Sequence, residues 1–252
     1  MTRLWDLARN TFRETIRDRI LYVLLVFALL MIASSVVFGT LTIGQDQKIV
    51  LDLGLGAIEL FGVAIAIFVG TSMIYKEIDK RTVYVVLTKP VPRPIFLIGK
   101  FLGLSLTLWV LLGLMGVGYL GLAALKGVFA PALIGAIGLI GLQLMLLVAI
   151  TVFFSSFTSP ILGMILTFSL YLIGHNTEAL RVLAQKASPA LKAAMEALYY
   201  VLPNLSTFDA KNQVVYGEAV PALRWIWAVG YGLAYTVALL ATASAIFERR
   251  EF

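Results

Sequence analysis

Long apolar stretches alternate along the chain with short groups of charged and helix-breaking residues. Stretches free of Asp, Glu, Lys and Arg cover residues 20–45, 60–75, 101–125, 127–177 and 225–247. About 20 apolar residues suffice for one crossing of a bilayer, because an α-helix rises about 1.5 Å per residue and satisfies its own backbone hydrogen bonds. The pattern therefore predicts an all-α, polytopic membrane protein.

One stretch, residues 127–177, is too long for a single crossing and contains the break Ser155-Ser156-Phe157-Thr158-Ser159-Pro160. Ser159 is suited to cap the start of a helix, and Pro160 suits the first helical position. Six membrane spans are therefore expected, and residues 20–252 would form a single transmembrane domain. The predicted bounds are 20–43, 53–75, 97–124, 131–154, 160–177 and 225–247. A single crossing by residues 127–177 is the alternative, and it would place the C-terminus outside the cell.

The first 19 residues form a separate element with two different sides. On a helical projection one side holds Leu4, Trp5, Leu7, Ala8, Thr11, Phe12, Thr15 and Ile16, and the charged residues occupy the other. Such a helix lies in a membrane interface. We therefore expect residues 1–19 to be an amphipathic interfacial helix, with Trp5 at headgroup depth and Phe12, Arg9 and Arg13 as further membrane-interface residues. A basic flank that only determines topology is the alternative.

Residues 178–224 are expected to be a partly helical external loop between the fifth and sixth spans. Ser188-Pro189 is a helix start signal, and apolar residues then recur at helical spacing at Leu191, Met195, Leu198 and Leu202. The pattern predicts a short amphipathic helix that rests on the outer leaflet or on the spans. The remainder of the loop shows no clear period.

The charge distribution predicts how the chain is oriented. Hydrophobic residues make up 60% of the sequence and charged residues 13%, with a formal net charge of +6. Lys and Arg gather at the ends of apolar stretches, which indicates topology and lipid contact rather than nucleic acid. Five precede residue 20, six lie within 76–100 and two at 249–250, against Lys48 and Lys126 in the short opposite loops. Because cation-rich flanks stay in the cytoplasm, both termini are expected there, in a multi-pass protein of the cell membrane.

The sequence lacks the residue types that several kinds of catalytic and metal-binding sites require. It has no Cys and a single His, which leaves no disulfide framework, zinc site or thiol nucleophile. No G-x-x-x-x-G-K-[ST] phosphate loop occurs, and an intramembrane protease would need a Ser–His pair or a His pair on the spans. We therefore expect no catalytic residue, metal or cofactor in this chain.

Two polar residues within the apolar stretches are candidates for a transport pathway. Glu59 lies about six residues inside the predicted second span, roughly 9 Å from its outer end, where a carboxylate is costly unless it faces protein or water. It is either a substrate or gating contact or a structural residue near the interface. His175, beside Asn176 and Glu178, is either a ligand or proton site or simply a polar helix end. A secondary transporter or channel subunit is the alternative function, but it would be expected to carry several intramembrane charges.

The segment 76–94 between the second and third spans combines charge, a short apolar run and prolines. It begins with KEIDKR, continues through Val83, Val85, Val86 and Leu87, and ends with Pro90, Pro92 and Pro94. Each proline disfavours helix in the residue before it, so the chain must turn before the third span. We expect a short cytoplasmic helix followed by a rigid elbow, which transmits force better than a flexible linker does.

The residues of this region resemble those of the permeases of type-2 ABC exporters. The shared pattern is an acidic cluster at the end of a span, a Thr, a short apolar helix, L-x-K-P-V-x-R, and G-K-x-x-G at the next span. In this sequence it is carried by Glu77, Thr82, Leu87, Lys89, Pro90, Val91, Arg93, Gly99, Lys100 and Gly103. The likeness is closest to the branch that includes the membrane subunit of nitrous oxide reductase copper-site maturation systems. Arg81 stands where many relatives have Gly.

The resemblance implies a permease that couples ATP hydrolysis in a separate subunit to export. Segment 76–94 would be a coupling helix in a cleft of that ATPase, with Glu77 as a polar anchor at the helix start and Arg93 as a clamp near the membrane. The expected ATPase-coupling residues are Glu77, Asp79, Arg81, Thr82, Leu87, Lys89, Pro90, Arg93, Ser155 and Ser156. The implied partners are two ATPase subunits, which bind ATP and Mg, and a second copy of this permease or a homologous one. Membrane lipid and a periplasmic or extracellular protein are further expected partners, and the apolar spans favour a lipidic or amphipathic cargo.

Overall fold

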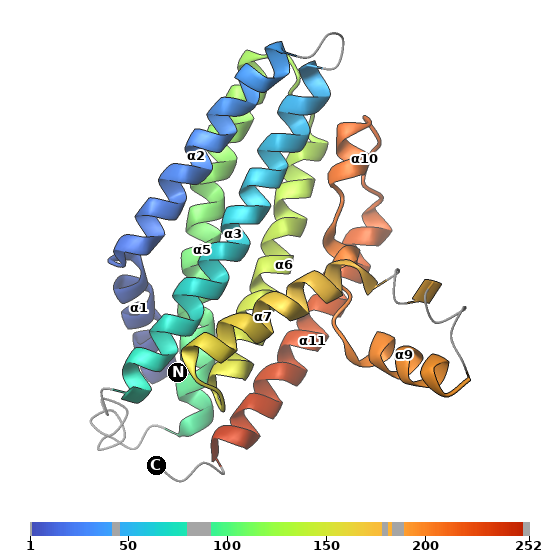
Figure 1. Cartoon of the computed structure of the whole chain (residues 1–252). Helices are drawn as coiled ribbons and strands as arrows, with labels where there is room; N and C mark the ends of the chain where they lie inside the picture. The colour runs from blue at the N-terminus through green and yellow to red at the C-terminus, as the bar shows by residue number, and fades with distance from the viewer. Residues whose placement is uncertain (1, 42–45, 80–91, 178–180, 183–188, 249–252) are drawn as a thin grey trace.

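The computed structural model describes residues 2–41, 46–79, 92–177, 181–182 and 189–248. These residues form helices and short connections, with no strand among them (Figure 1). The all-α prediction is therefore confirmed for the part of the chain that is described. The central part of the predicted coupling helix, including Arg81, Thr82, Leu87, Lys89 and Pro90, lies outside the described residues.

Seven helices make up the bundle, among the residues described. They are α1 (Thr2–Ile16), α2 (Arg19–Thr40), α3 (Asp46–Asp79), α5 (Arg93–Leu125), α6 (Ala132–Ser155), α7 (Pro160–His175) and α11 (Ala222–Glu248). The connection from α7 to α11 contains α9 (Pro189–Val201), the 3₁₀ helix η1 (Leu205–Phe208) and α10 (Lys211–Val215).

Five helices of the described part are long and apolar enough to cross a membrane, namely α2, α3, α5, α6 and α11. The fifth predicted span, 160–177, corresponds to α7, which begins at Pro160 as expected, although the Ser159 side chain makes no capping hydrogen bond. With 16 residues α7 is about 24 Å long, which is shorter than the roughly 30 Å hydrocarbon core. A multi-pass membrane protein is therefore established, with α7 as a shorter apolar helix.

Helix α3 differs most from its predicted span, 53–75. It begins seven residues earlier, at Asp46, and ends four residues later, at Asp79. A helix does not have to stop where the hydrocarbon core stops, because charged side chains are solvated beyond it. Glu77 and Asp79 therefore lie in the last turn of α3, and not at the start of a separate coupling helix.

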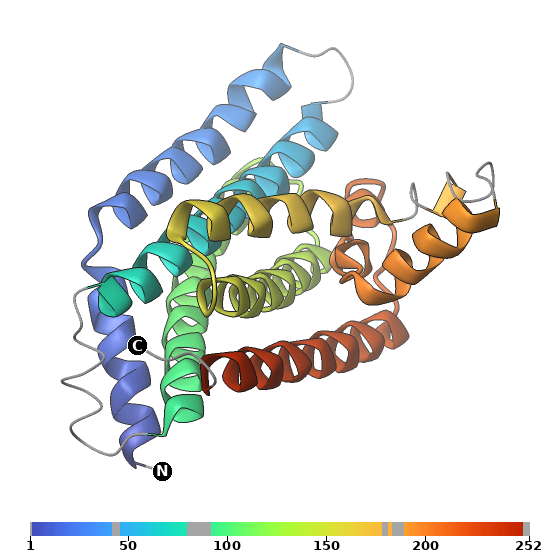
Figure 2. The ribbon, with the colours of Figure 1, turned by 60° about the horizontal axis from the view of Figure 1, so that its bottom comes forward.

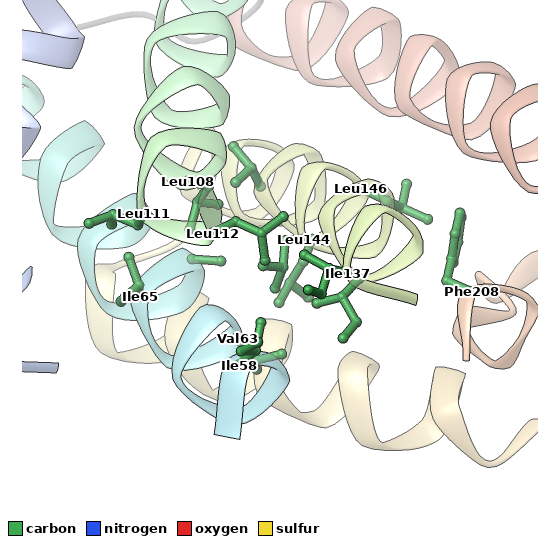
Figure 3. Close-up of a cluster of buried hydrophobic side chains, with 14 of the residues drawn as sticks. Ile58, Val63, Ile65, Leu108, Leu111, Leu112, Ile137, Leu144, Leu146 and Phe208 are labelled. Atoms are coloured by element: carbon green, nitrogen blue, oxygen red, sulfur yellow. The ribbon is translucent and has the colours of Figure 1, made fainter. Parts of the chain in front are cut away.

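The core is built around α6, which contacts α3, α5, α7 and α11. Figure 3 shows apolar side chains of α3, α5 and α6 gathered in one cluster, with Phe208 of η1 beside them. Two glycines on α6 admit large rings, since a Cβ at Gly138 would lie 2.6 Å from Trp225 of α11 and one at Gly141 would lie 2.6 Å from Trp109 of α5. These glycines serve close helix packing.

Helix α1 packs against the first turns of α5. A Cβ at Gly99 would lie 2.5 Å from the Leu7 side chain, and one at Gly103 would lie 2.6 Å from the Ala8 carbonyl oxygen. Thr11 and Thr15 are buried on the same side, whereas Trp5 is 63% exposed. Part of the side of α1 that was predicted to face lipid therefore packs against α5. The small residues of the two helices allow this close approach. Arg9 and Arg13 are exposed and Phe12 is half-buried, and their place in a membrane interface stays a prediction.

The helices alternate in direction through the bundle. Figures 1 and 2 show α2, α5 and α7 running one way and α3, α6 and α11 the other, with α7 oblique to its neighbours. The end of α3, the start of α5 and the end of α11 consequently gather with α1 at one end of the molecule.

Candidate functional site

A buried polar cluster surrounds Glu59 in the middle of α3. Glu59 lies thirteen residues after Asp46, the first residue of α3, or about 20 Å along the helix. Its side chain is only 4% exposed. Burying a carboxylate costs free energy unless hydrogen bonds and an opposite charge compensate for the lost water.

Three side chains from three other elements satisfy this carboxylate. Gln143 Nε2 of α6 donates to Glu59 Oε1 at 2.9 Å, and the Tyr171 hydroxyl of α7 donates to the same oxygen at 3.0 Å. Lys211 Nζ of α10 forms an ion pair with Glu59 Oε2. The carboxylate therefore joins α3, α6, α7 and α10 at one point.

His175, the last residue of α7, lies between two carboxylates. Its Nε2 is 3.4 Å from Asp209 Oδ2, and its Nδ1 is 3.9 Å from Glu59 Oε1. The ring also lies against Tyr171, with ring centroids 5.7 Å apart. The two pathway candidates from the sequence, Glu59 and His175, thus belong to one cluster. Its six members are Glu59, Gln143, Tyr171, His175, Asp209 and Lys211, and we call it the polar cluster.

Asp209 and Lys211 reach the cluster because residues 203–215, which we call the connecting segment, fold into the bundle. The side chain of Asn204 accepts a hydrogen bond from the Ser206 N–H at 3.1 Å, which starts η1. Leu205 and Phe208 are then fully buried. The sequence predicted no structure here, since a single turn of 3₁₀ helix and five residues of α-helix are too short to show a period.

Helices α7 and α11 hold the connecting segment from two sides. At Gly174 of α7 a Cβ would lie 2.6 Å from the Pro203 carbonyl oxygen. Arg224 of α11 donates to Gln213 Oε1 at 2.7 Å and to the backbone oxygen of Asp209. The segment is therefore positioned by packing and by hydrogen bonds that do not involve Glu59.

Asp209 and Lys211 lie outside the candidate membrane helices and hold opposite charges. Burial acts to raise the pKa of Asp209, but hydrogen bonds from His175 and from the Lys211 backbone, with the Lys211 charge, bring this pKa below its usual value. Burial acts to lower the pKa of Lys211, but the charge and hydrogen bond of Glu59 bring it above its usual value. Both groups are therefore ionised at neutral pH.

The residues expected to contact an ATPase lie elsewhere. Glu77 and Asp79 occupy the last turn of α3, and Arg93 is the first residue of α5. Ser155 and Ser156 are buried at the connection from α6 to α7, where Phe157 is 40% exposed. The structure thus brings together the two pathway candidates but leaves the roles of the coupling residues as predictions.

An apolar groove runs between α3 and α7, the two helices that also carry Glu59 and His175. Its volume is about 430 Å³, and it is lined by Leu60, Val63, Ala64, Ile67, Phe68, Ile161, Met164, Ile165 and Phe168. Such a lining accommodates an alkyl chain and offers nothing to a charged solute. No group of three His, Cys, Asp or Glu residues suited to hold a metal ion occurs among the residues described.

Comparison with known proteins gives one match over almost the whole chain. A family model described as ABC-2 family transporter protein matches residues 5–252. No curated protein matches the chain.

Proposed function

This chain belongs to the ABC-2 transporter family, as a membrane subunit of an ABC transporter, and from that premise we propose that it is an exporter permease driven by ATP hydrolysis in a separate subunit. ATP and Mg would be bound by that partner. Within the family we assign it to the branch that includes the nitrous oxide reductase maturation permease, from the motif residues between Glu77 and Gly103.

The proposed topology has six spans, α2, α3, α5, α6, α7 and α11, with both termini in the cytoplasm. Two observations support it. The six helices alternate in direction, so that α1 and the end of α11 lie at the same end of the bundle (Figure 1). Among the described residues, the Lys and Arg at positions 3–19, at the end of α3 and in the first turns of α5 lie at that same end, whereas the short connections at the other end hold only Lys48 and Lys126.

The observation that best supports ATP coupling is the continuity of α3. This helix runs over 34 residues, from Asp46 to Asp79, without interruption. One end leads into the predicted coupling segment, and Glu59 lies 18 residues before Glu77, about 27 Å along the same helix. Because an α-helix is stiff along its axis, a displacement applied by the ATPase at Asp79 would be transmitted to the polar cluster.

A second helix would receive the same displacement. Arg93, proposed as a clamp near the membrane, starts α5, and α1 is packed on the following turns at Gly99 and Gly103. Lys100 Nζ also lies 4.0 Å from Glu14 Oε2 of α1. Helices α1 and α5 would therefore move together. The connection from α6 to α7 offers the ATPase a second surface at the same end, where Phe157 is the exposed large side chain beside Ser155 and Ser156.

The proposed complex contains two ATPase subunits and two permeases, either two copies of this chain or this chain and a homologous one. A lipidic or amphipathic cargo is supported by the apolar lining of the groove between α3 and α7. Mechanical work on a periplasmic or extracellular partner would use the same movements of the helices.

Co-purification with the ATPase and coupled transport by reconstituted complexes test this proposal. Glu77→Lys and Leu87→Asp are expected to leave membrane insertion intact and to reduce transport per ATP hydrolysed by about tenfold, because a reversed or buried charge disrupts a seated helix. Glu196→Lys, a reversal on the exposed side of α9, is the matched control and should have no effect.

Two results would contradict the proposal. The first is normal coupling in both Glu77→Lys and Leu87→Asp while the complex stays assembled. The second is purification of an active transporter that contains no ATPase subunit.

A further inference from the structure

The polar cluster has an unusual arrangement of charge around His175. Both nitrogens of the ring face a carboxylate oxygen, Nε2 towards Asp209 at 3.4 Å and Nδ1 towards Glu59 at 3.9 Å. A neutral imidazole has an N–H on one nitrogen and a lone pair on the other. The lone pair of that second nitrogen would therefore point at the lone pairs of a carboxylate oxygen, which is repulsive. An imidazolium presents a positively charged N–H to each carboxylate, so this arrangement fits the protonated ring. Among the described residues the buried Nδ1 has no hydrogen-bond partner, and its contact with Glu59 at 3.9 Å is an attraction between charges.

The charges of the cluster lead to the same conclusion. Glu59 and Asp209 bring two negative charges, and Lys211 brings one positive charge. Among the described residues, Tyr171 on the helix of His175 and the uncharged Gln143 of α6 complete the cluster as hydrogen-bond donors to Glu59. Beyond them Arg224 of α11 binds the Asp209 backbone, and Asp52 of α3 acts on Lys211. The charges of Glu59, His175, Asp209 and Lys211 sum to zero only when His175 holds a proton, and an uncompensated charge beside the buried Glu59 is costly.

We propose that Glu59, His175 and Asp209 form a proton-binding site whose occupation holds the connecting segment, residues 203–215, against α3 and α7. The proton joins three parts of the chain, since each carboxylate comes from a different element and the imidazole from a third. Loss of the proton leaves two carboxylates facing an imidazole with a single N–H, and one of the two contacts becomes repulsive. The connecting segment is then held on its polar side by Lys211, by Arg224 and by the Asn204 N–H, which donates to the Tyr231 hydroxyl of α11 at 2.7 Å.

The site is placed so that a proton can reach it. The His175 side chain is 24% exposed and that of Asp209 is 23% exposed, whereas Glu59 is almost fully enclosed. Protons therefore enter from the side of the connecting segment and not from the interior of the bundle. Histidine is the side chain whose charge changes between about pH 5 and 8, so the contact responds within the range that a membrane protein meets on its two sides.

Release of the connecting segment from α3 and α7 would expose the side chain of Val214, and a cysteine at that position would report this exposure. Val214 of α10 is buried and Ala219 is exposed, and the chain has no Cys of its own. The full chain with Val214→Cys, and separately with Ala219→Cys, is reconstituted in nanodiscs, and maleimide labelling rates are measured between about pH 5 and 8. The ratio of the two rates removes the effect of pH on thiol reactivity.

The expected result is a ratio that rises about tenfold as the pH is raised, the size expected for loss of the attraction between the imidazolium and the two carboxylates. His175→Gln should make the ratio high and independent of pH, and His175→Lys, which keeps the charge, should make it low and independent of pH. An unchanged ratio in the wild-type background overturns the proposal, as does a pH response that persists in His175→Gln. The chain is labelled without any ATPase, so this result is separate from the test of ATP coupling.

Discussion

Gly103 of α5 lies so close to Ala8 of α1 that a Cβ at Gly103 would stand 2.6 Å from the Ala8 carbonyl oxygen. The same Cβ would lie 2.5 Å from Thr11 Cβ, so Gly103 cannot be enlarged without moving a helix. The N-terminal helix is consequently seated on the helix that follows the proposed coupling segment. Any movement of the start of α5 is expected to carry α1 with it.

Replacing Gly103 by Ala is therefore expected to destabilise the protein. The added methyl group has to displace backbone rather than a flexible side chain, which costs about 1–3 kcal/mol. The melting temperature of the purified chain in detergent should fall. Gly113→Ala, at a position on α5 where a Cβ meets nothing within 4 Å, is the control and should lose nothing. Equal melting temperatures for the two variants would show that α1 is not seated as described.

Lys211→Met is expected to be more costly than any single change at the protein surface. It leaves Glu59 buried without its counter-charge, which typically costs about 3–5 kcal/mol. Adding Glu59→Gln should restore most of the loss, because a neutral amide no longer needs that partner. Unfolding of the single and double variants by denaturant measures both effects.

The control for this cycle is the exposed pair Lys192 and Glu196 of α9, which are 4.0 Å apart and 52% and 55% exposed. Lys192→Met should change stability by at most about 1 kcal/mol, as solvated pairs do. If Lys211→Met lost no more stability than Lys192→Met, the burial of Glu59 would not depend on Lys211.

Acidification is expected to weaken the connecting segment through Asp209. The folded-state pKa of Asp209 is lower than its usual value of 3.8. Its ionised form therefore contributes stability above that value, and the contribution is lost as the pH falls through the folded-state pKa. The melting temperature should decrease on acidification below about pH 4, and the decrease should be smaller in Asp209→Asn. Identical acid profiles for the two proteins would contradict this assignment.

Single cysteines test the proposed orientation. Lys126 is exposed at the end of α5, and Phe157 is exposed at the connection from α6 to α7. The 24 residues of α6 separate these two connections, so they should lie on opposite sides of the membrane. In intact cells a membrane-impermeant maleimide should label Lys126→Cys and not Phe157→Cys, and permeabilised cells should label both. The reverse pattern would invert the topology and place the coupling segment outside.

The sequence alone was sufficient for the helices themselves. Apolar stretches of 20 residues or more leave the backbone no partner in lipid except its own carbonyl groups, so α2, α3, α5, α6 and α11 followed from composition. Local signals also located the starts of two helices, Pro160 for α7 and Pro189 for α9. Helix formation and helix starts depend on residues that are neighbours along the chain, so they can be read from the sequence alone.

The membership of the polar cluster was decided only by the tertiary structure. Glu59 and His175 were recognised separately because polar residues are conspicuous in apolar stretches. Gln143 gives the same signal in α6 but was not singled out, and Asp209 and Lys211 carry no local signal. The partners of Glu59 lie 84, 112 and 152 residues away along the chain. Which of them meet depends on the direction in which each helix faces and on the packing of Leu205 and Phe208 that brings the connecting segment inward. The directions of the helices and the packing of the connecting segment are set by the free energy of the whole bundle. They therefore cannot be predicted from any single stretch of the sequence.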